Sequence, residues 1–293
     1  MTFLSPASRA VAGISVLAIL FVVGGAATAA IAASTTWSTP VNVSASGQNH
    51  NLHIVVDASG RATAVWDNQL GNNVIVQAST SLNGGPWSSP NTVSTTGYND
   101  YPQIAVNGSG LATAVWQHVE NNNHAVQASY SVNGGGWSSP TTVSTTGNNT
   151  NPQITVDGSG RATAVWVSGG LSNNVQVSSS DNGGTWTTPQ TLANTADTVP
   201  NPQIIVDGSG LATTVWQDSV GILHASSSLN GGTWSNPVIV SSNEVSYNAQ
   251  ITVDASGRIG YVNLSRTHQG NLSGTQGGVE RAILGYARGD SSY

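Results

Sequence analysis

The chain of 293 residues is poor in charge: Asp, Glu, Lys and Arg make up 7% of it, and the formal net charge is -6. It has no basic patch that could neutralise phosphates, which argues against nucleic acid as a partner. It also has no cysteine, so packing and strand pairing must hold the fold together without disulfides.

Residues 1–32 have the pattern of a secretory signal peptide. Arg9 precedes a long uncharged apolar run, and Ala30 and Ala32 fit a small-x-small cleavage pattern, with the cut after Ala32. The run is also long enough to span a bilayer, so an uncleaved anchor is the alternative. In either case we expect a secreted, extracellular or cell-surface protein in which residues 33–293 form one domain.

Residues 33–293 contain five copies of one sequence unit. The stretch QITVDGSGRATAVW, at 153–166, recurs with small changes, and its tryptophan falls at a spacing of fifty residues: Trp66, Trp116, Trp166 and Trp216. A second series interleaves with the first: Trp37, Trp87, Trp137, Trp186 and Trp234. Buried between units, two tryptophans per repeat would provide a large apolar contact. A repeat of this length made of short strands indicates a propeller or a stack.

Within one unit, alternation of apolar and polar residues and the turn residues predict four antiparallel strands. In the third unit we expect them at 153–157, 161–166, 173–180 and 185–193. The last unit ends without a fourth strand, whereas residues 36–44 read as a fourth strand with no unit before them. Sharing one sheet between the two ends removes exposed strand edges. We therefore predict an all-β, five-bladed β-propeller of four-stranded blades, the fifth closed by pairing of residues 36–44 with 280–288.

One polar residue recurs at the first turn of every unit. A single carboxylate or amide per turn suits turn capping and is too few ligands for calcium. The histidines, such as His50 and His53, are too sparse for a zinc site. We expect neither a metal nor a cofactor. The turn residues are Asp57, Asn107, Asp157, Asp207 and Asp254.

The octad SSDNGGTW, at 179–186, has the pattern S-x-D-x-G-x-T-W. It resembles the Asp-box, or bacterial neuraminidase repeat, of sialidase-like β-propellers. The resemblance implies a hairpin between the third and fourth strands, on the face opposite the ligand-binding mouth. It also implies structural roles for Ser179, Asp181, Gly183, Thr185 and Trp186, with the carboxylate accepting backbone N–H groups. The other units keep the glycines and the tryptophan but carry Leu82, Val132 and Leu229 in place of the aspartate.

The resemblance to sialidases would also imply three arginines at the mouth. Arg61, Arg161 and Arg258 share one repeated position on the Asp-box side, so no such triad assembles, and we expect a non-catalytic member. The alternative is a glycoside hydrolase, which needs two or three carboxylates at the mouth. The one candidate cluster is Asp67, Asp100 and Glu120, which could equally be solvated loop carboxylates.

The remaining mouth residues are amides, tyrosines and a histidine. Amide groups pair donors with acceptors, and Tyr98 or Tyr101 could stack on a sugar ring. The other reading is that the glutamines only satisfy strand ends around a wet channel. We predict a monomeric, non-enzymatic binding module for glycan or polysaccharide, since near-identical units favour multivalent binding. One equivalent position holds His53, Gln103, Gln153, Gln203 and Gln250.

Overall fold

The computed structural model describes residues 39–287 with internal gaps at 45, 96, 146, 170–172, 196–200, 242–245, 255–256 and 268–278. The expected signal peptide, residues 1–32, lies outside the described residues. Within the described part, no helix is long and apolar enough to cross a membrane. The described elements belong to one compact unit that begins at Pro40.

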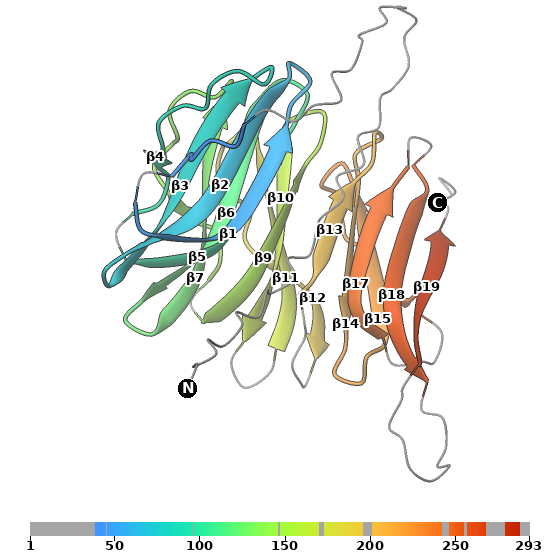
Figure 1. The fold of residues 1–293 in the computed structure, drawn as a ribbon. Helices are drawn as coiled ribbons and strands as arrows, with labels where there is room; N and C mark the ends of the chain where they lie inside the picture. Colours follow the sequence, from blue (N-terminus) through green and yellow to red (C-terminus); the bar gives the residue numbers. More distant parts are fainter. Residues whose placement is uncertain are drawn as a thin grey trace, which may run out of the picture. The chain divides into compact units, whose positions relative to one another are not determined.

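The described residues form β-strands and no helix, in agreement with the predicted all-β class (Figure 1). The first two repeats contain β1 (Gln48–Val56), β2 (Arg61–Leu70), β3 (Asn73–Leu82) and β4 (Asn91–Thr92), then β5 (Tyr98–Val106), β6 (Leu111–Glu120), β7 (Asn123–Val132) and β8 (Thr141–Thr142). The third and fourth contain β9 (Asn148–Val156), β10 (Arg161–Gly169), β11 (Asn173–Asp181) and β12 (Gln190–Thr195), then β13 (Gln203–Val206), β14 (Leu211–Gln217), β15 (Leu223–Leu229) and β16 (Val238–Ile239). The fifth contains β17 (Ser246–Val253), β18 (Ile259–Thr267) and β19 (Val279–Ala287).

Each of the first four repeats is a four-stranded antiparallel unit, as the alternation predicted. The strands pair in sequence order, for example β1 with β2, β2 with β3 and β3 with β4. Single parallel bridges, Val74 with Tyr98 and His124 with Asn148, connect the third strand of one unit to the first strand of the next. The first strands of successive units also contact one another: β1 with β5, β5 with β9, β9 with β13 and β13 with β17.

The first turn of each unit is held by its polar residue, as predicted. Asp57 Oδ1 accepts hydrogen bonds from the Ser59 amide at 2.9 Å, the Ser59 hydroxyl at 2.6 Å and the Arg61 amide at 3.0 Å. Asn107 accepts from its turn through Oδ1 in the same way. These side chains are therefore used in turn capping.

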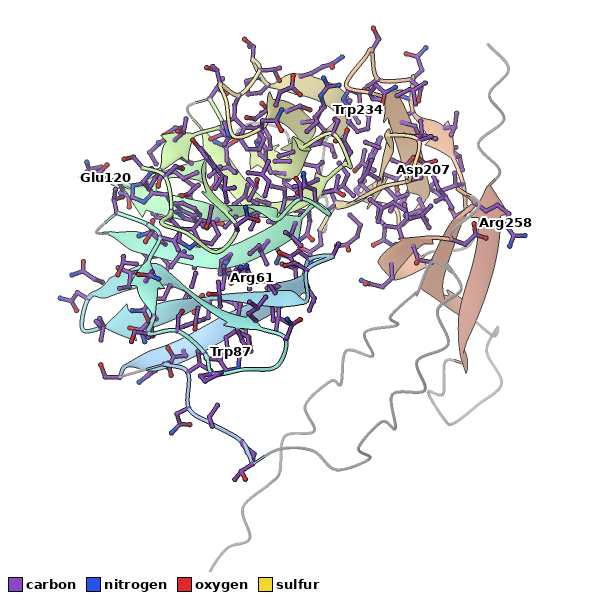
Figure 2. The ribbon with its side chains drawn as sticks, turned by 90° about the horizontal axis from the view of Figure 1, so that it is seen from above. Arg61, Trp87, Glu120, Asp207, Trp234 and Arg258 are labelled. Atoms are coloured by element: carbon purple, nitrogen blue, oxygen red, sulfur yellow. The ribbon has the colours of Figure 1, made fainter. Side chains whose placement is uncertain are left out.

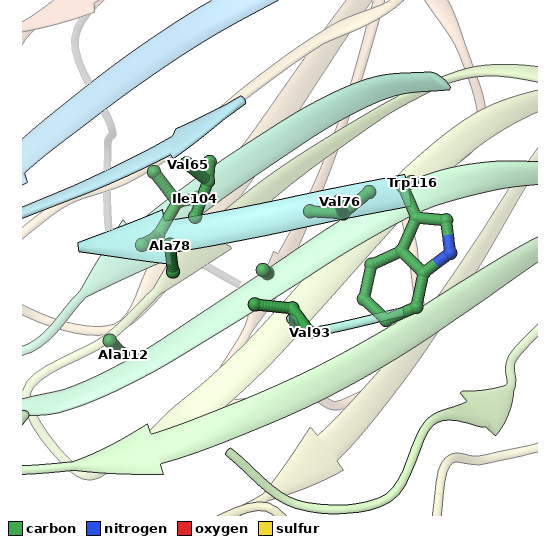
Figure 3. Close-up of a cluster of buried hydrophobic side chains, with 8 residues drawn as sticks. Val65, Val76, Ala78, Val93, Ile104, Ala112 and Trp116 are labelled. Atoms are coloured by element: carbon green, nitrogen blue, oxygen red, sulfur yellow. The ribbon is translucent and has the colours of Figure 1, made fainter. Parts of the chain in front are cut away.

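Tryptophans of both series lie at the boundaries between units. Trp116 is fully buried, and it shares a cluster with Val65 and Val76 of the first unit and Ile104 of the second (Figure 3). Trp137, from the other series, packs against the same cluster. Trp186 and Trp234 occupy corresponding places at the next two boundaries. The tryptophan pairs thus hold neighbouring units together, as their spacing predicted.

One face of the first unit is exposed in the described part of the chain. We call the side of a unit that would meet the preceding unit its leading face, and in the first unit this face carries Leu52, Ile54 and Val56. These side chains are 65%, 56% and 56% exposed, whereas Ile104, which is equivalent to Ile54, is 8% exposed. The difference arises because Ile104 packs on the unit before it and Ile54 does not.

At the other end, β18 is the partner of β19 among the described strands, and residues 39–44 run without strand pairing. Residues 36–38 and 288 lie outside the described residues. The predicted pairing of residues 36–44 with 280–288 therefore remains a prediction.

Candidate functional site

The first strands share an irregularity just before the equivalent glutamine position. The register shifts between His50 and His53 in β1 and between Asp100 and Gln103 in β5. The residue two positions before the glutamine position has positive φ in four units: Asn51 (49°), Tyr101 (51°), Asn151 (54°) and Asn201 (25°). In the first three units it lies within the bulge.

Tyr101 departs from this pattern. Asparagine tolerates the left-handed region, whereas a bulky side chain pays a steric cost of about 1–2 kcal/mol there. Tyr101 is nevertheless 47% exposed as a residue, so burial does not repay this cost. Backbone strain that the packing does not explain is typical of a functional position.

Two of the three predicted carboxylates come together beside Tyr101. Asp67 is 2% exposed, and it accepts hydrogen bonds from the His50 amide at 3.1 Å and from Asn51 Nδ2 at 2.7 Å. Asp100 is 8% exposed, and its Oδ1 has no hydrogen-bond partner in the protein. Burial, with the negative charge of Asp67 as a second cause, raises the pKa of Asp100 to about 6.

The carboxylate pair also affects the neighbouring Tyr98. The charge of Asp100, followed by burial, Tyr101 and Asp67, raises the pKa of Tyr98. Tyr98 is 47% exposed as a residue, like Tyr101. Two exposed aromatic rings and two buried carboxyl groups therefore lie together where β1, β2 and β5 meet. We call this set, Asp67, Asp100, Tyr98 and Tyr101, the mouth cluster.

Glu120 lies apart from the two buried carboxylates, although it follows Val119, the cross-strand partner of Tyr98. It ends β6 at a hairpin tip, three residues beyond Gln117, which pairs with Asp100; three strand residues span about 10 Å. Its side chain is 74% exposed, and its Oε2 lies 3.8 Å from His118 Nε2. Figure 2 shows Glu120 at the outer margin of the drawn side chains. The structure thus brings together a pair of carboxylates and leaves the third at a loop tip.

The repeated glutamine position, which is His53 in the first unit, lies at the same place along the first strand of each unit. His53, Gln103 and Gln153 pair in register with Val65, Val115 and Val165. Gln103 Nε2 lies 2.9 Å from His53 Nε2, which links the first two units. Burial lowers the pKa of His53, so this ring is neutral at pH 7.

Two of the other glutamines, Gln203 and Gln250, form hydrogen bonds to the residue directly before them in the chain. The side-chain amides of Gln203 and Gln250 donate to the carbonyls of Pro202 and Ala249, at 3.3 and 3.2 Å. Gln153 and Gln203 are partly buried, and Gln250 is exposed. Of the five residues at this position, His53 and Gln103 are thus the two that lie next to the mouth cluster.

Two residues of the site were missed as contributors by sequence reasoning. His50 and Asn51 orient Asp67 through its hydrogen bonds. The signal for Asn51 was present, since asparagine recurs at this position in other units and tyrosine replaces it in the second. In the described part of the chain, no group of three or more His, Cys, Asp or Glu side chains is placed to hold a metal ion.

The Asp-box octad forms a hairpin at the opposite ends of the strands. Gly183 has φ of 75°, and Trp186 packs between the second and third units. Ser179 Oγ lies 3.1 Å from Thr163 Oγ1, and Thr185 is exposed.

The carboxylate of Asp181 accepts a hydrogen bond from Arg161 Nε at 2.6 Å, where backbone N–H donors had been expected. This hydrogen bond lowers the pKa of Asp181. The arginine takes this role because Arg161 is the cross-strand partner of Asp181.

Comparison with known proteins identifies the fold. No protein-family model and no curated protein matches the chain. The structure resembles the Hadza microbial sialidase Hz136 with a TM-score of 0.52 and 13% identity, over 74% of this chain and 53% of that one. It resembles the BP39L lectin from Burkholderia pseudomallei with a TM-score of 0.54 and 16% identity, over 71% and 61%.

The polysaccharide lyase Uly1 is similar to the same degree, with a TM-score of 0.54 and 10% identity, over 83% of this chain and 59% of that one. The chain has a sialidase-like fold. It spans about half the length of the sialidase Hz136. Since these proteins include two enzymes and a lectin, the fold alone does not assign an activity.

Proposed function

We propose that the protein is a secreted, monomeric and non-enzymatic β-propeller that binds neutral carbohydrate at the mouth cluster. The observation that carries the proposal is Tyr101, an exposed aromatic ring held with positive φ where other units have asparagine. A ring that is both exposed and strained suits stacking on a sugar face, which repays its cost on binding.

The groups around Tyr101 suit hydroxyl recognition. The linked His53 and Gln103 offer a donor and an acceptor near the cluster. Tyr98 adds a second exposed ring. A few directed polar groups beside aromatic surface are the usual composition of a small-ligand site.

We further propose that the five units close into a ring, so that the fifth unit covers the leading face of the first. A repeating contact supports this. Each first-turn glycine lies near the turn residue of the preceding unit: Gly110 near Asp57, Gly160 near Asn107, Gly210 near Asp157 and Gly257 near Asp207. Among the described residues, the three atoms nearest to a Cβ added at Gly60 belong to Asn83 of its own unit, and Asp254 is the turn residue that would complete the series.

The arginines support the same closure. We call the hairpin between the third and fourth strands of each unit its box hairpin. Arg61 lies over Gly134 in the box hairpin of the second unit, and Arg161 lies over Gly231 in that of the fourth. Gly84, the corresponding glycine of the first unit, has nothing within 4 Å of the position of an added Cβ. Arg258 holds the position of Arg61 and Arg161 in the fifth unit, so it is the side chain that would cover Gly84. Closure would also bury Leu52, Ile54 and Val56.

Binding is tested with Tyr101→Asn, which installs the residue of the other units. The purified chain is titrated calorimetrically with neutral hexasaccharides derived from cellulose, xylan, mannan and arabinan. We expect an oligosaccharide that binds the parent to bind the variant at least about tenfold more weakly, a loss of about 1.4 kcal/mol. Leu229→Ala, at an exposed position of a box hairpin, is the matched control and should bind as the parent does. Unchanged binding by Tyr101→Asn would overturn the proposal.

The second candidate function is glycoside hydrolysis, favoured by the buried pair of Asp67 and Asp100. A carboxyl group that stays protonated up to about pH 6 beside a hydrogen-bonded carboxylate has the properties of a general acid and its partner. Release of reducing sugar from the same oligosaccharides decides between the two functions. Release that is abolished by both Asp67→Asn and Asp100→Asn would assign catalysis, whereas binding without release supports the first proposal.

A further inference from the structure

A cavity of about 400 Å³ lies between the second and third units, on the Asp-box side. It is lined by hydroxyl side chains and two aromatic rings, among them Thr113, Ser129, Tyr130, Thr185 and Trp186. Thr113 lies four residues before Gln117, the partner of Asp100, which is about 13 Å along β6. The cavity is therefore separate from the mouth cluster.

The corresponding place between the third and fourth units is nearly filled. There a cavity of about 10 Å³ is lined by the equivalent residues Thr163, Ser179, Gly231 and Trp234, together with Arg161. The guanidinium of Arg161 lies against Gly231. The second unit carries Leu111 where the third carries Arg161, and Leu111 is buried. No arginine lines the open cavity, and Tyr130 lies against Gly183 as Arg161 lies against Gly231.

One polar group in the open cavity lacks a partner. The equivalent threonines of the next two units pair with serine hydroxyls, Thr163 with Ser179 at 3.1 Å and Thr213 with Ser227 at 2.7 Å. In the second unit Tyr130 replaces this serine, and Thr113 Oγ1 is buried with no hydrogen-bond partner among the described residues. An unsatisfied buried hydroxyl costs about 1–3 kcal/mol, which a bound ligand can recover.

The aromatic rings give the cavity a second recognition element. Tyr130 packs against the box hairpin of the third unit, where an added Cβ at Gly183 would lie 2.6 Å from Tyr130 Cδ1. Trp186 is partly buried and forms part of the lining. The lining contains no charged side chain. Aromatic surface, hydroxyls and no charge match an uncharged sugar rather than an anion or a cation.

We propose that this cavity is a second carbohydrate site, which takes a neutral sugar unit against Trp186 and Tyr130 with a hydroxyl bonded to Thr113 Oγ1. Its volume falls within the range of about 300–1,000 Å³ that is usual for small-ligand sites. Leucine replaces the arginine in the fourth unit as well, at Leu211. Tyr130 is local to the second unit, because the corresponding cross-strand residues are Thr80, Ser179 and Ser227. The combination of Leu111 and Tyr130 therefore belongs to the second unit and does not follow from the repeat as such.

The test uses two substitutions that copy other units. Leu111→Arg introduces the side chain that occupies the equivalent place in the first and third units, and Tyr130→Ser restores the hydroxyl pair seen for Thr163 and Ser179. Each variant is titrated calorimetrically with the same cellulose, xylan, mannan and arabinan hexasaccharides, and the tryptophan indole N–H signals are followed by NMR. We expect the parent to bind at two sites and each variant at one, with at least about tenfold weaker binding at the lost site.

The two proposals fail in different ways. If Tyr101→Asn abolishes all binding and neither Leu111→Arg nor Tyr130→Ser changes it, the second site is overturned and the mouth proposal stands. If the two cavity variants abolish all binding and Tyr101→Asn changes nothing, the mouth proposal is overturned and the cavity site stands. Should Leu111→Arg fail to fold, Tyr130→Ser alone decides, since it removes no group that Thr113 now uses. Absence of binding by the parent would overturn both.

Discussion

The first and second units have almost the same sequence pattern, and two of their differences are instructive. Ile54 is 56% exposed on the leading face of the first unit, whereas Ile104 is 8% exposed in the second. At the mouth, the first unit has His50 and Asn51 where the second has Asp100 and Tyr101. The first difference shows that burial in a repeat protein depends on the neighbouring unit. The second shows that a specific site arises where one unit departs from the repeat.

The largest expected effect concerns the two isoleucines. Ile104→Ala should cost about 2–5 kcal/mol in the free energy of unfolding, because it leaves a cavity between the first two units. If the ring is closed, Ile54→Ala costs a similar amount. Urea unfolding of the two variants gives the comparison. A cost below about 0.5 kcal/mol for Ile54→Ala, as for an exposed residue, contradicts closure.

The next effect is a pH dependence of the free energy of unfolding, caused by Asp100. Its pKa is raised from 3.8 to about 6 in the folded protein, so the folded state holds a proton that the unfolded state has lost. Stability should therefore fall as pH rises from about 4 to 6 and then level off. The full loss is at most about 3 kcal/mol.

Asp100→Asn is the matched variant for this prediction, because it resembles the protonated form at every pH. It should be more stable than the parent at pH 7, and its unfolding free energy should vary less between pH 4 and 6. Urea unfolding across this range measures both. Parallel pH profiles for parent and variant would contradict the account.

A smaller effect is expected from exchanging the bulge residues. Tyr101→Asn should stabilise the fold by about 1 kcal/mol, since it relieves positive φ at a bulky residue. The reciprocal change, Asn51→Tyr, should destabilise it by at least that amount, because it also removes the hydrogen bond from Asn51 Nδ2 to Asp67. Thermal unfolding of both variants tests the pair. Destabilisation by Tyr101→Asn would show that the tyrosine serves the fold and not a ligand.

The smallest effect compares two arginines. Arg61→Leu should cost about 0.5–1 kcal/mol, because the stem and guanidinium that cover Gly134 are lost. Arg258→Leu should cost about as much if Arg258 covers Gly84 in a closed ring. Urea unfolding of the two single variants, each with the other arginine intact, makes the comparison. No measurable cost at Arg258 would count against the proposed contact.

The repeat pattern predicted the strands, their antiparallel order and the boundary tryptophans, because these features depend on alternation within one unit. It also drew attention to Asp67, Asp100, Tyr98 and Tyr101, which stand out as departures from the repeat. It could not predict the partner of Asp181, the unsatisfied Thr113 or the cavity beside Trp186. These depend on side chains of neighbouring strands or units, such as Arg161 and Tyr130, whose reach requires the structure.

Whether the five units close into a ring can be measured as a distance between the first and the fifth unit. The chain has no native cysteine, so spin labels can be placed by substitution alone. Double electron–electron resonance on Ser59→Cys with Ser109→Cys gives the distance between turns of adjacent units. The account predicts the same distance for Ser59→Cys with Ser256→Cys, in samples diluted with unlabelled protein. A clearly longer or broadly distributed distance for that second pair would contradict it.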